Sequence, residues 1–178
     1  MNKHFEPIFN ALQEQKENLL GQVKSISPDT FNYKPAPGKW SINQILMHLI
    51  TSEKLSIGYM KKKSLGVDQL RNSGIMEKIR IGFFIISQRL PLKYKAPRVV
   101  VDKTPQAGSL TELIQQWDAV RSELADFLER IEDKNVYKVI YKHPFAGRLD
   151  VAQTMIFFRE HIIHHSPQIF RILDTPDK

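Results

Sequence analysis

Apolar residues recur every three or four positions through four long segments of the chain. This spacing places them on one face of an α-helix, and it predicts helices over residues 3–26, 41–62, 109–131 and 150–172. The alternation typical of a strand is confined to Val136–Tyr141. Because each helix must bury its apolar face against another, the chain is predicted to be all-α, a four-helix bundle.

Recognisable start signals support three of these helices. Ser41 and Gln44 have the spacing of a capping box, in which each side chain bonds the backbone amide of the other residue. Trp40 and Ile45 flank this cap as a hydrophobic staple. The same spacing recurs at the next two long helices, as Ser109 with Glu112 and, in weaker form, as Asp150 with Gln153.

A long crossover, residues 63–108, connects the second and third of the predicted helices. It contains a shorter predicted helix near Ile75–Leu90 and an extended, proline-bounded stretch, Lys95–Pro105. A crossover of this length allows the two helices it joins to run parallel. No repeat, low-complexity tract or break in composition divides the chain, so we expect residues 1–178 to form a single helical-bundle domain.

The composition excludes several classes of protein. With 42% hydrophobic and 25% charged residues, the chain is unlike a disordered one. Its longest apolar runs, Phe83–Ile86 among them, are far short of the roughly 18 residues of a membrane span, and its first residues lack the apolar core of a secretory signal. The absence of cysteine excludes disulfides, thiolate metal sites and cysteine nucleophiles. A cytoplasmic location without a membrane span is the expectation.

The basic excess of the chain is concentrated in residues 61–103. Lys and Arg total 26 against 19 Asp and Glu, and 11 of the cations but only 3 of the acids lie in this segment. Such a segment suits either a solvated face of a long connection or a contact with phosphates or an anionic membrane surface. Since no recognised nucleic-acid motif accompanies it, no nucleic-acid partner is expected.

Three of the six histidines lie close together in the last predicted helix. His161 and His165 are four positions apart, so both imidazoles project from one helix face, which is the spacing that presents two nitrogens to one metal ion. His164 is displaced by about 60° around the axis and suits a flanking position. The alternative for the pair is a hydrogen-bonded polar cluster or the wall of a cleft.

A metal ion would need a third ligand from another helix, and His48 is the candidate. It lies on the flank of the apolar face of the second helix, where a lone histidine is also typical of a core edge. Tyr59 and Gln168 are candidates for orienting a bound molecule. Neither Glu53 nor Glu160, the acids next to these histidines, shares their helix face, so no general base is apparent.

Three segments of the chain resemble the DinB-like superfamily of helical-bundle proteins. They are the sequences WSINQILMHL at 40–49, HPFAG at 143–147 and HIIHHSPQI at 161–169, and the resemblance extends over roughly residues 5–173. The chain departs from the family pattern at Pro167, which cannot donate a helical hydrogen bond and tends to kink a helix beside Gln168.

The resemblance implies a divalent metal held by one histidine of the second helix and two of the last. By motif position these are His48, His161 and His165, while His143 and His164 are not expected to be ligands. Nitrogens about 2.0–2.2 Å from the ion, or roughly 3–4 Å apart without one, are expected. Because imidazoles with a pKa of about 6.5 must be neutral to bind, affinity is expected to fall below about pH 6.

The family also implies candidate activities. Three neutral imidazoles leave open positions on the ion, as in catalytic sites, and suit zinc or nickel. DinB-like proteins include metal-dependent hydrolases and thiol S-transferases that use a low-molecular-weight thiol as cofactor. We therefore expect a metal-dependent hydrolase or thiol transferase acting on a small-molecule substrate, as a homodimer. The alternative is a non-catalytic metal-binding or stress-response module.

Overall fold

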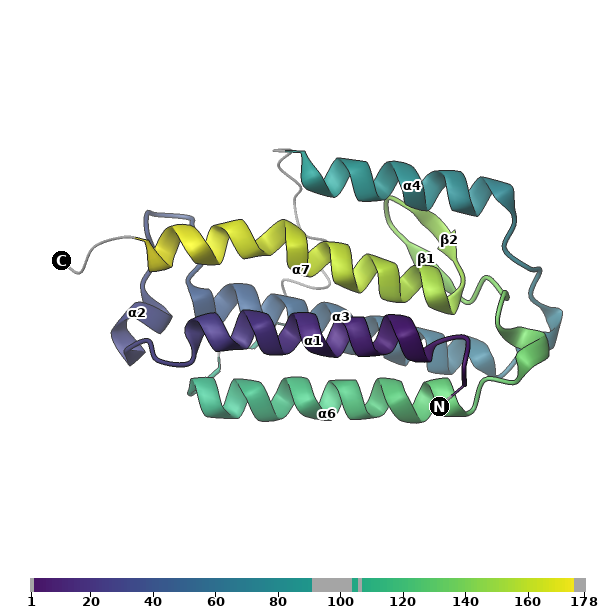
Figure 1. The fold of residues 1–178 in the computed structure, drawn as a ribbon, viewed down its shortest axis with the longest axis horizontal. Coiled ribbons are helices and arrows are strands. Elements are labelled where there is room, and N and C mark those ends of the chain that lie inside the picture. The colour runs from purple at the N-terminus through teal and green to yellow at the C-terminus, as the bar shows by residue number, and fades with distance from the viewer. Residues whose placement is uncertain (1, 91–103, 106, 175–178) are drawn as a thin grey trace.

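The predicted four-helix bundle is present in the computed structural model, which describes residues 2–90, 104–105 and 107–174 (Figure 1). Helices account for 69% of the structure, which confirms the all-α prediction. The long helices end within about three residues of their predicted limits. They are α1 (Glu6–Val23), α3 (Ile42–Ser64), α6 (Leu110–Glu129) and α7 (Val151–Leu173).

The four long helices form a closed ring of contacts. Both α3 and α1 pack against α6 and α7. The colour gradient of Figure 1 shows that α3 and α6 run in one direction and that α1 and α7 run in the other. The long crossover therefore connects two parallel helices, as its length allows. Helix α7 continues through Pro167 to Leu173.

A fifth long helix, α4 (Ile75–Arg89), lies on the outside of this ring. It matches the short helix predicted within the crossover and packs against α7 and the β-hairpin (Figure 1). A single 3-10 turn, η1 (Val67–Gln69), precedes it. Apart from Thr104 and Pro105, the extended stretch predicted over 95–105 lies outside the described residues.

The predicted strand at Val136–Tyr141 is largely wrong. A 3-10 turn, η2 (Asp133–Asn135), precedes an antiparallel hairpin of β1 (Tyr141–His143) and β2 (Gly147–Leu149), so only Tyr141 lies in a strand as predicted. The pairing depends on a tight turn that ends at Gly147, whose φ of 76° favours glycine. Such short strands carry too few residues for a clear alternation.

The helix starts follow the predicted caps with one difference. Ser41 and Gln44 bond each other's backbone amides, both at 3.2 Å, so that capping box is complete. At the start of α6 the Ser109 hydroxyl accepts from the amide of Glu112, but the Glu112 carboxylate accepts from the amide of Gly108 instead. The Asp150–Gln153 box is complete. A short helix, α2 (Pro28–Asn32), was not predicted and begins at a further cap, Ser27.

The centre of the bundle combines a large apolar core with one buried ion pair. Glu53 of α3 accepts hydrogen bonds from Arg121 at 2.8 Å and from the Trp117 indole at 3.1 Å, and all three side chains are buried. This contact fixes α3 against α6. Among the described helices, none combines the length and apolar character that a membrane crossing requires.

Candidate metal centre

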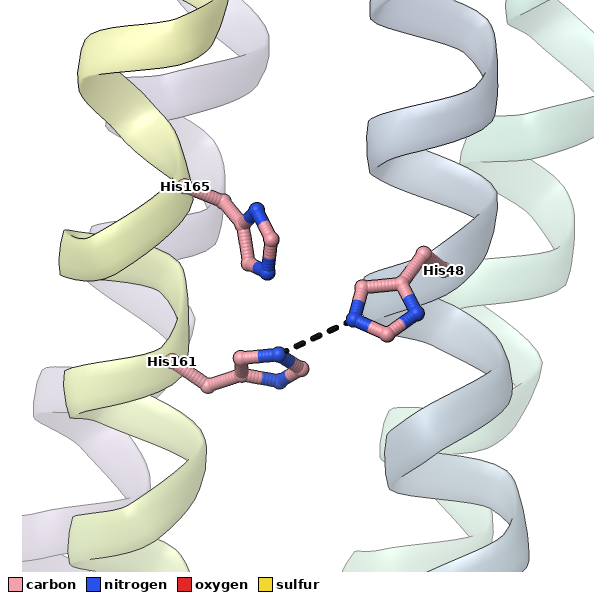
Figure 2. A group of neighbouring side chains, drawn as sticks. All are labelled: His48, His161 and His165. Atoms are coloured by element: carbon pink, nitrogen blue, oxygen red, sulfur yellow. Dashed lines mark hydrogen bonds between the residues drawn. The ribbon is translucent and has the colours of Figure 1, made fainter. Parts of the chain in front are cut away.

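Helices α3 and α7 bring His48, His161 and His165 together. Figure 2 shows the three rings pointing toward one another across the space between the two helices. His48 projects from the second turn of α3, whose start is fixed by the Ser41 cap, and the other two project from one face of α7. One ring nitrogen from each histidine lies within 4.8 Å of the other two.

The separations suit a single divalent ion. The Nε2 atoms of His48 and His161 are 3.1 Å apart, and tetrahedral coordination at a metal–nitrogen distance of about 2.05 Å would separate two ligands by about 3.3 Å. The centroids of the three rings are 4.8 to 5.0 Å apart. His48 is therefore well inside the distance of about 8 Å beyond which side-chain rotation could not close a shared coordination sphere.

Aromatic rings hold the histidines in place. Trp40 lies against His48, with ring centroids 4.9 Å apart, and stacks on His165 at 6.2 Å. Phe157, one turn before His161 on α7, stacks on its ring at 5.4 Å. The Nδ1 atoms of His48 and His165 have no hydrogen-bond partner among the described residues, so ring packing contributes to the orientation of these two side chains.

The surroundings keep the three imidazoles neutral. Burial, together with a smaller effect of the nearby His164, lowers the pKa of His48 to about 4. Burial also lowers the pKa of His165 to about 3, helped by the charges of His48 and His164 and opposed by the Gln168 side chain. Burial and the other histidines lower the pKa of His161 as well. Neutral imidazole is the form that binds a metal ion.

The two residues expected beside the cluster on α7 lie near it. His164 places its ring edge-to-face on His165, with centroids 5.0 Å apart, and its Nδ1 is 3.2 Å from the carbonyl oxygen of Gln88. A carbonyl only accepts, so His164 carries its proton on Nδ1. It joins α7 to the end of α4 beside the site. Gln168 is near enough to His165 for a side-chain hydrogen bond, which partly opposes the lowering of the pKa of that histidine.

Tyr59 lies further from the cluster than the other candidates. It is eleven residues beyond His48 on α3, a helical rise of about 16 Å. Its ring contacts Tyr141 edge-to-face at 5.7 Å, and Tyr141 stacks on Phe157 at 6.1 Å. Since Phe157 also stacks on His161, Tyr59 stands at the far end of a row of aromatic rings that leads to the site.

His143 belongs to the same aromatic row and is not part of the three-histidine cluster. Its ring centroid is 4.4 Å from that of Phe157, and its Nδ1 accepts hydrogen bonds from the amides of Phe145 and Ala146. Burial lowers the pKa of His143 to about 4. The hairpin thus holds a neutral histidine with its proton on Nε2 beside Phe157. The sequence places this residue before a proline and gives no sign of that contact.

The nearby carboxylates are engaged elsewhere, as their helical phase predicts. Glu53 binds Trp117 and Arg121 on α6. Glu160 is buried and accepts from Arg89 of α4 and from Arg159. Within the described part of the chain, the cluster therefore contains imidazoles and no carboxylate.

Comparison with known proteins identifies the family. The profile of the DinB superfamily matches residues 11–169, which is most of the chain. The chain belongs to the DinB superfamily. The three-histidine cluster of this DinB protein joins two of the three segments that carry the resemblance, the start of α3 and the middle of α7.

Two further comparisons cover nearly the whole DinB chain. It is 25% identical over 183 aligned residues to the uncharacterized protein YuaE of Bacillus subtilis (strain 168), with 96% of this chain and 98% of YuaE covered. It also resembles a solved structure of YfiT from Bacillus subtilis, described as a probable metal-dependent hydrolase with an unusual four-helix bundle topology. That match has a TM-score of 0.59 at 13% identity and covers 97% of this chain and 87% of YfiT, so it establishes the shared fold.

Proposed function

We propose that this DinB protein is a metal-dependent enzyme that acts on a small molecule, with His48, His161 and His165 as the ligands of one divalent ion. The observation that carries the proposal is the convergence of three neutral imidazoles from two helices, with two Nε2 atoms 3.1 Å apart. The description of YfiT as a probable metal-dependent hydrolase is consistent with it.

The ligand set favours a catalytic ion over a structural one. Three protein ligands would leave at least one coordination position open, and because the cluster has no carboxylate among the described residues, a bound divalent ion would keep its double charge. When bound, zinc or nickel would supply Lewis-acid chemistry, polarising a carbonyl or activating a water or thiol. His161 is the least buried of the three histidines, so we expect a small molecule to approach from its side of the cluster.

The chain's own residues would confine and orient such a molecule. The rings of Trp40 and Phe157 pack on the histidines and exclude water from two sides of the cluster. His164 and Gln168 flank His165 and offer polar groups for orientation.

Hydrolysis and thiol transfer are both compatible with this site. Hydrolysis needs only water as the second reactant. Thiol transfer is supported by the neutrality of the three ligands. A doubly charged ion whose ligands carry no charge favours an anionic thiolate. The chain has no cysteine, so the thiol would be a separate small molecule.

Assays of the metal-loaded protein test the proposal. We expect zinc- or nickel-loaded protein to hydrolyse an activated ester, or to form a thioether from a small thiol and an electrophilic aryl halide with release of the halide ion and the thiol proton, and chelation to abolish the activity. The His161→Ala variant should lose at least about a hundredfold of the rate, because a ligand is removed. The His4→Ala variant is the matched control, since His4 is exposed and contacts Tyr137 instead.

Metal binding without turnover would contradict the catalytic part of the proposal. If the protein binds one ion per chain but neither reaction depends on it, the chain is a metal-binding module of the DinB fold. If both reactions persist in His161→Ala, the histidine cluster is not the active site.

A further inference from the structure

Helix α4 exposes an apolar stripe on the outside of the molecule (Figure 1). It consists of six large side chains, each between 46% and 77% exposed: Ile75, Met76, Ile79, Phe83, Ile86 and Leu90. At 100° per residue, all six fall within an arc of about 100° around the helix. Their exposed area is on the order of 600 Å², which equals the largest apolar patch of a typical monomer, and a patch of this size marks a contact surface.

The opposite face of α4 fixes the helix to the bundle. Phe84 is buried there, with its ring centroid 4.9 Å from that of His143 in the hairpin and 5.9 Å from that of Phe157 on α7. At the end of the helix, Arg89 pairs with Glu160 of α7. Since the inner face of α4 is used in this packing, the stripe faces outward and is available to a partner outside the chain.

Cations flank the stripe on both sides. Lys78 and Arg89 lie beyond one edge of the apolar arc and Arg80 lies beyond the other, each about 40–60° outside it. All three side chains are exposed. Long cationic side chains in these positions cover apolar surface with their stems while their charged ends reach outward. This arrangement is typical of a helix that lies in the plane of a membrane interface.

The hairpin extends the cationic side of this surface. The Arg80 guanidinium lies close to Gly147, 3.5 Å from where a Cβ atom on that residue would stand. The next residue, Arg148, is exposed and lies directly opposite the exposed Lys142 across the two strands. Like charges in such a pair repel each other, and neither cation has a carboxylate within ion-pair distance among the described residues. An anionic partner would relieve this repulsion.

No exposed acid offsets these cations on α4 or the hairpin. The one acid of α4 is Glu77, which is buried and paired with Arg71, and residues 141–149 contain none. The surface thus has four cations without an ion-pair partner among the described residues: Lys78, Arg80, Lys142 and Arg148. Clusters of four to eight are typical of anionic-lipid contacts. Two copies of this surface would repel each other, so its charge favours an anionic partner over a second copy of the chain.

We infer that α4 and the hairpin form a peripheral docking surface for a bilayer that contains anionic phospholipid. The apolar stripe inserts about 5–10 Å, to the boundary between headgroups and acyl chains, and the flanking cations contact the lipid phosphates. A nucleic acid would match the charge of this surface but would leave the stripe in water. A bilayer matches both features, and this mode of binding needs no membrane-spanning helix.

Vesicle flotation tests the docking surface. Wild type should float with vesicles of phosphatidylglycerol and phosphatidylcholine at low salt, and it should bind phosphatidylcholine alone at least about tenfold more weakly. Phe83→Asp should weaken binding to the mixed vesicles at least about tenfold, because it removes an inserted ring and adds an anion. Tyr137→Asp is the matched control, since Tyr137 is an exposed aromatic outside α4, and it should bind as wild type does.

The same assay tests the cations of the hairpin. Arg148→Gln should weaken binding to the mixed vesicles about fivefold, because one cation near the surface is lost. Lys54, an exposed cation of α3, provides the control, and Lys54→Gln should leave binding unchanged. Equal losses in the two variants would mean that net charge alone drives binding, which would overturn the assigned surface.

A fluorescent label locates the contact independently of the effect of a substitution on affinity. The chain has no cysteine, so an environment-sensitive dye attaches only at the position that Phe83→Cys or Tyr137→Cys introduces. The dye at position 83 should brighten on addition of the mixed vesicles, and the dye at position 137 should not. Failure of wild type to float, or an equal response of the two dyes, would overturn the inference.

Two further outcomes would assign the surface to another partner. Vesicle binding that Phe83→Asp retains and that duplex DNA displaces would show a site for polyanions without lipid insertion. A wild-type dimer in light scattering that does not float, and that Phe83→Asp dissociates, would show that a second copy covers the stripe. Either result would overturn the inference.

Discussion

His48, His161 and His165 are held as neutral imidazoles, the form that binds a metal cation, because their lowered pKa values disfavour protonation. Their pKa values are lowered chiefly by burial, to about 4 for His48 and about 3 for His165. The ordinary pKa of about 6.5 predicts that protons compete with a metal below about pH 6. The lowered values move this competition in the folded protein toward pH 4.

The same shifts make the metal-free protein sensitive to acid. Below pH 6.5 the imidazoles of the unfolded chain take up protons while those of the folded cluster stay neutral, so the free energy of unfolding falls as pH falls. For His48, whose pKa is lowered to about 4, the loss at pH 5 is about 2 kcal/mol. Urea unfolding of chelator-treated wild type and His48→Gln, compared at pH 7.5 and pH 5, measures it. A difference between the two proteins that is the same at both pH values would contradict the pKa account.

The Glu53–Arg121 pair has a separate, structural role. Arg121→Met would leave the Glu53 carboxylate buried without its countercharge, which costs about 3–5 kcal/mol of unfolding free energy. Replacing both residues with Met should recover most of that loss. As a control, Glu123→Gln at the partly exposed Lys61–Glu123 pair should cost at most about 1 kcal/mol. Equal losses at the two pairs, measured by chemical denaturation, would be inconsistent with the buried pair's isolation from water.

Individual site residues were predictable to different degrees. The pairing of His161 and His165 follows from helical spacing alone, which is local. His48 became a firm candidate only through the family resemblance, since nothing local shows which face of α3 meets α7. The contacts of Trp40 and Phe157 with the histidines depend on how α3, α7 and the preceding loop pack together. Trp40 was expected to act as a staple at the start of its helix, and that pattern does not predict its ring contact with His165.

Helix α3 carries both His48 and Glu53, so its start matters to the site. Ser41→Ala removes the side-chain acceptor for the Gln44 amide and should lower the free energy of unfolding by about 1 kcal/mol. Ser25, exposed in the turn after α1, offers a control whose change to Ala should stay within about 0.5 kcal/mol. Thermal unfolding of both variants gives the comparison, and an equal effect would show that the cap does not stabilise α3.

The long elements followed from the sequence, and the short ones did not. A helix of twenty residues repeats its apolar spacing several times, so α3, α6 and α7 were located to within a few residues. Helix α2 has five residues and the strands have three each, too few to repeat any period. The hairpin is stabilised by its turn and by packing against α4. An alternation of apolar and polar residues reveals neither of these.

The whole bundle should respond to metal binding, because the three histidines connect α3 with α7. An ion that binds only the folded chain raises the free energy of unfolding by about 2.7 kcal/mol at a free concentration a hundred times its dissociation constant. The apolar core does not depend on the site, so the chelated protein should stay helical at neutral pH. Scanning calorimetry with and without zinc measures the shift, which His161→Ala should lack. Loss of helical dichroism on chelation would mean instead that the ion is structural.

The most direct test of the metal centre is the metal content of the protein and three variants, measured by elemental analysis after dialysis against zinc or nickel. Wild type and His164→Ala should each hold one ion per chain, because His164 lies beside the cluster and its Nδ1 faces the Gln88 carbonyl. His48→Ala and His161→Ala should each hold close to none at the same free metal concentration. A full ion in His48→Ala or His161→Ala would contradict the proposal that these histidines form one metal site.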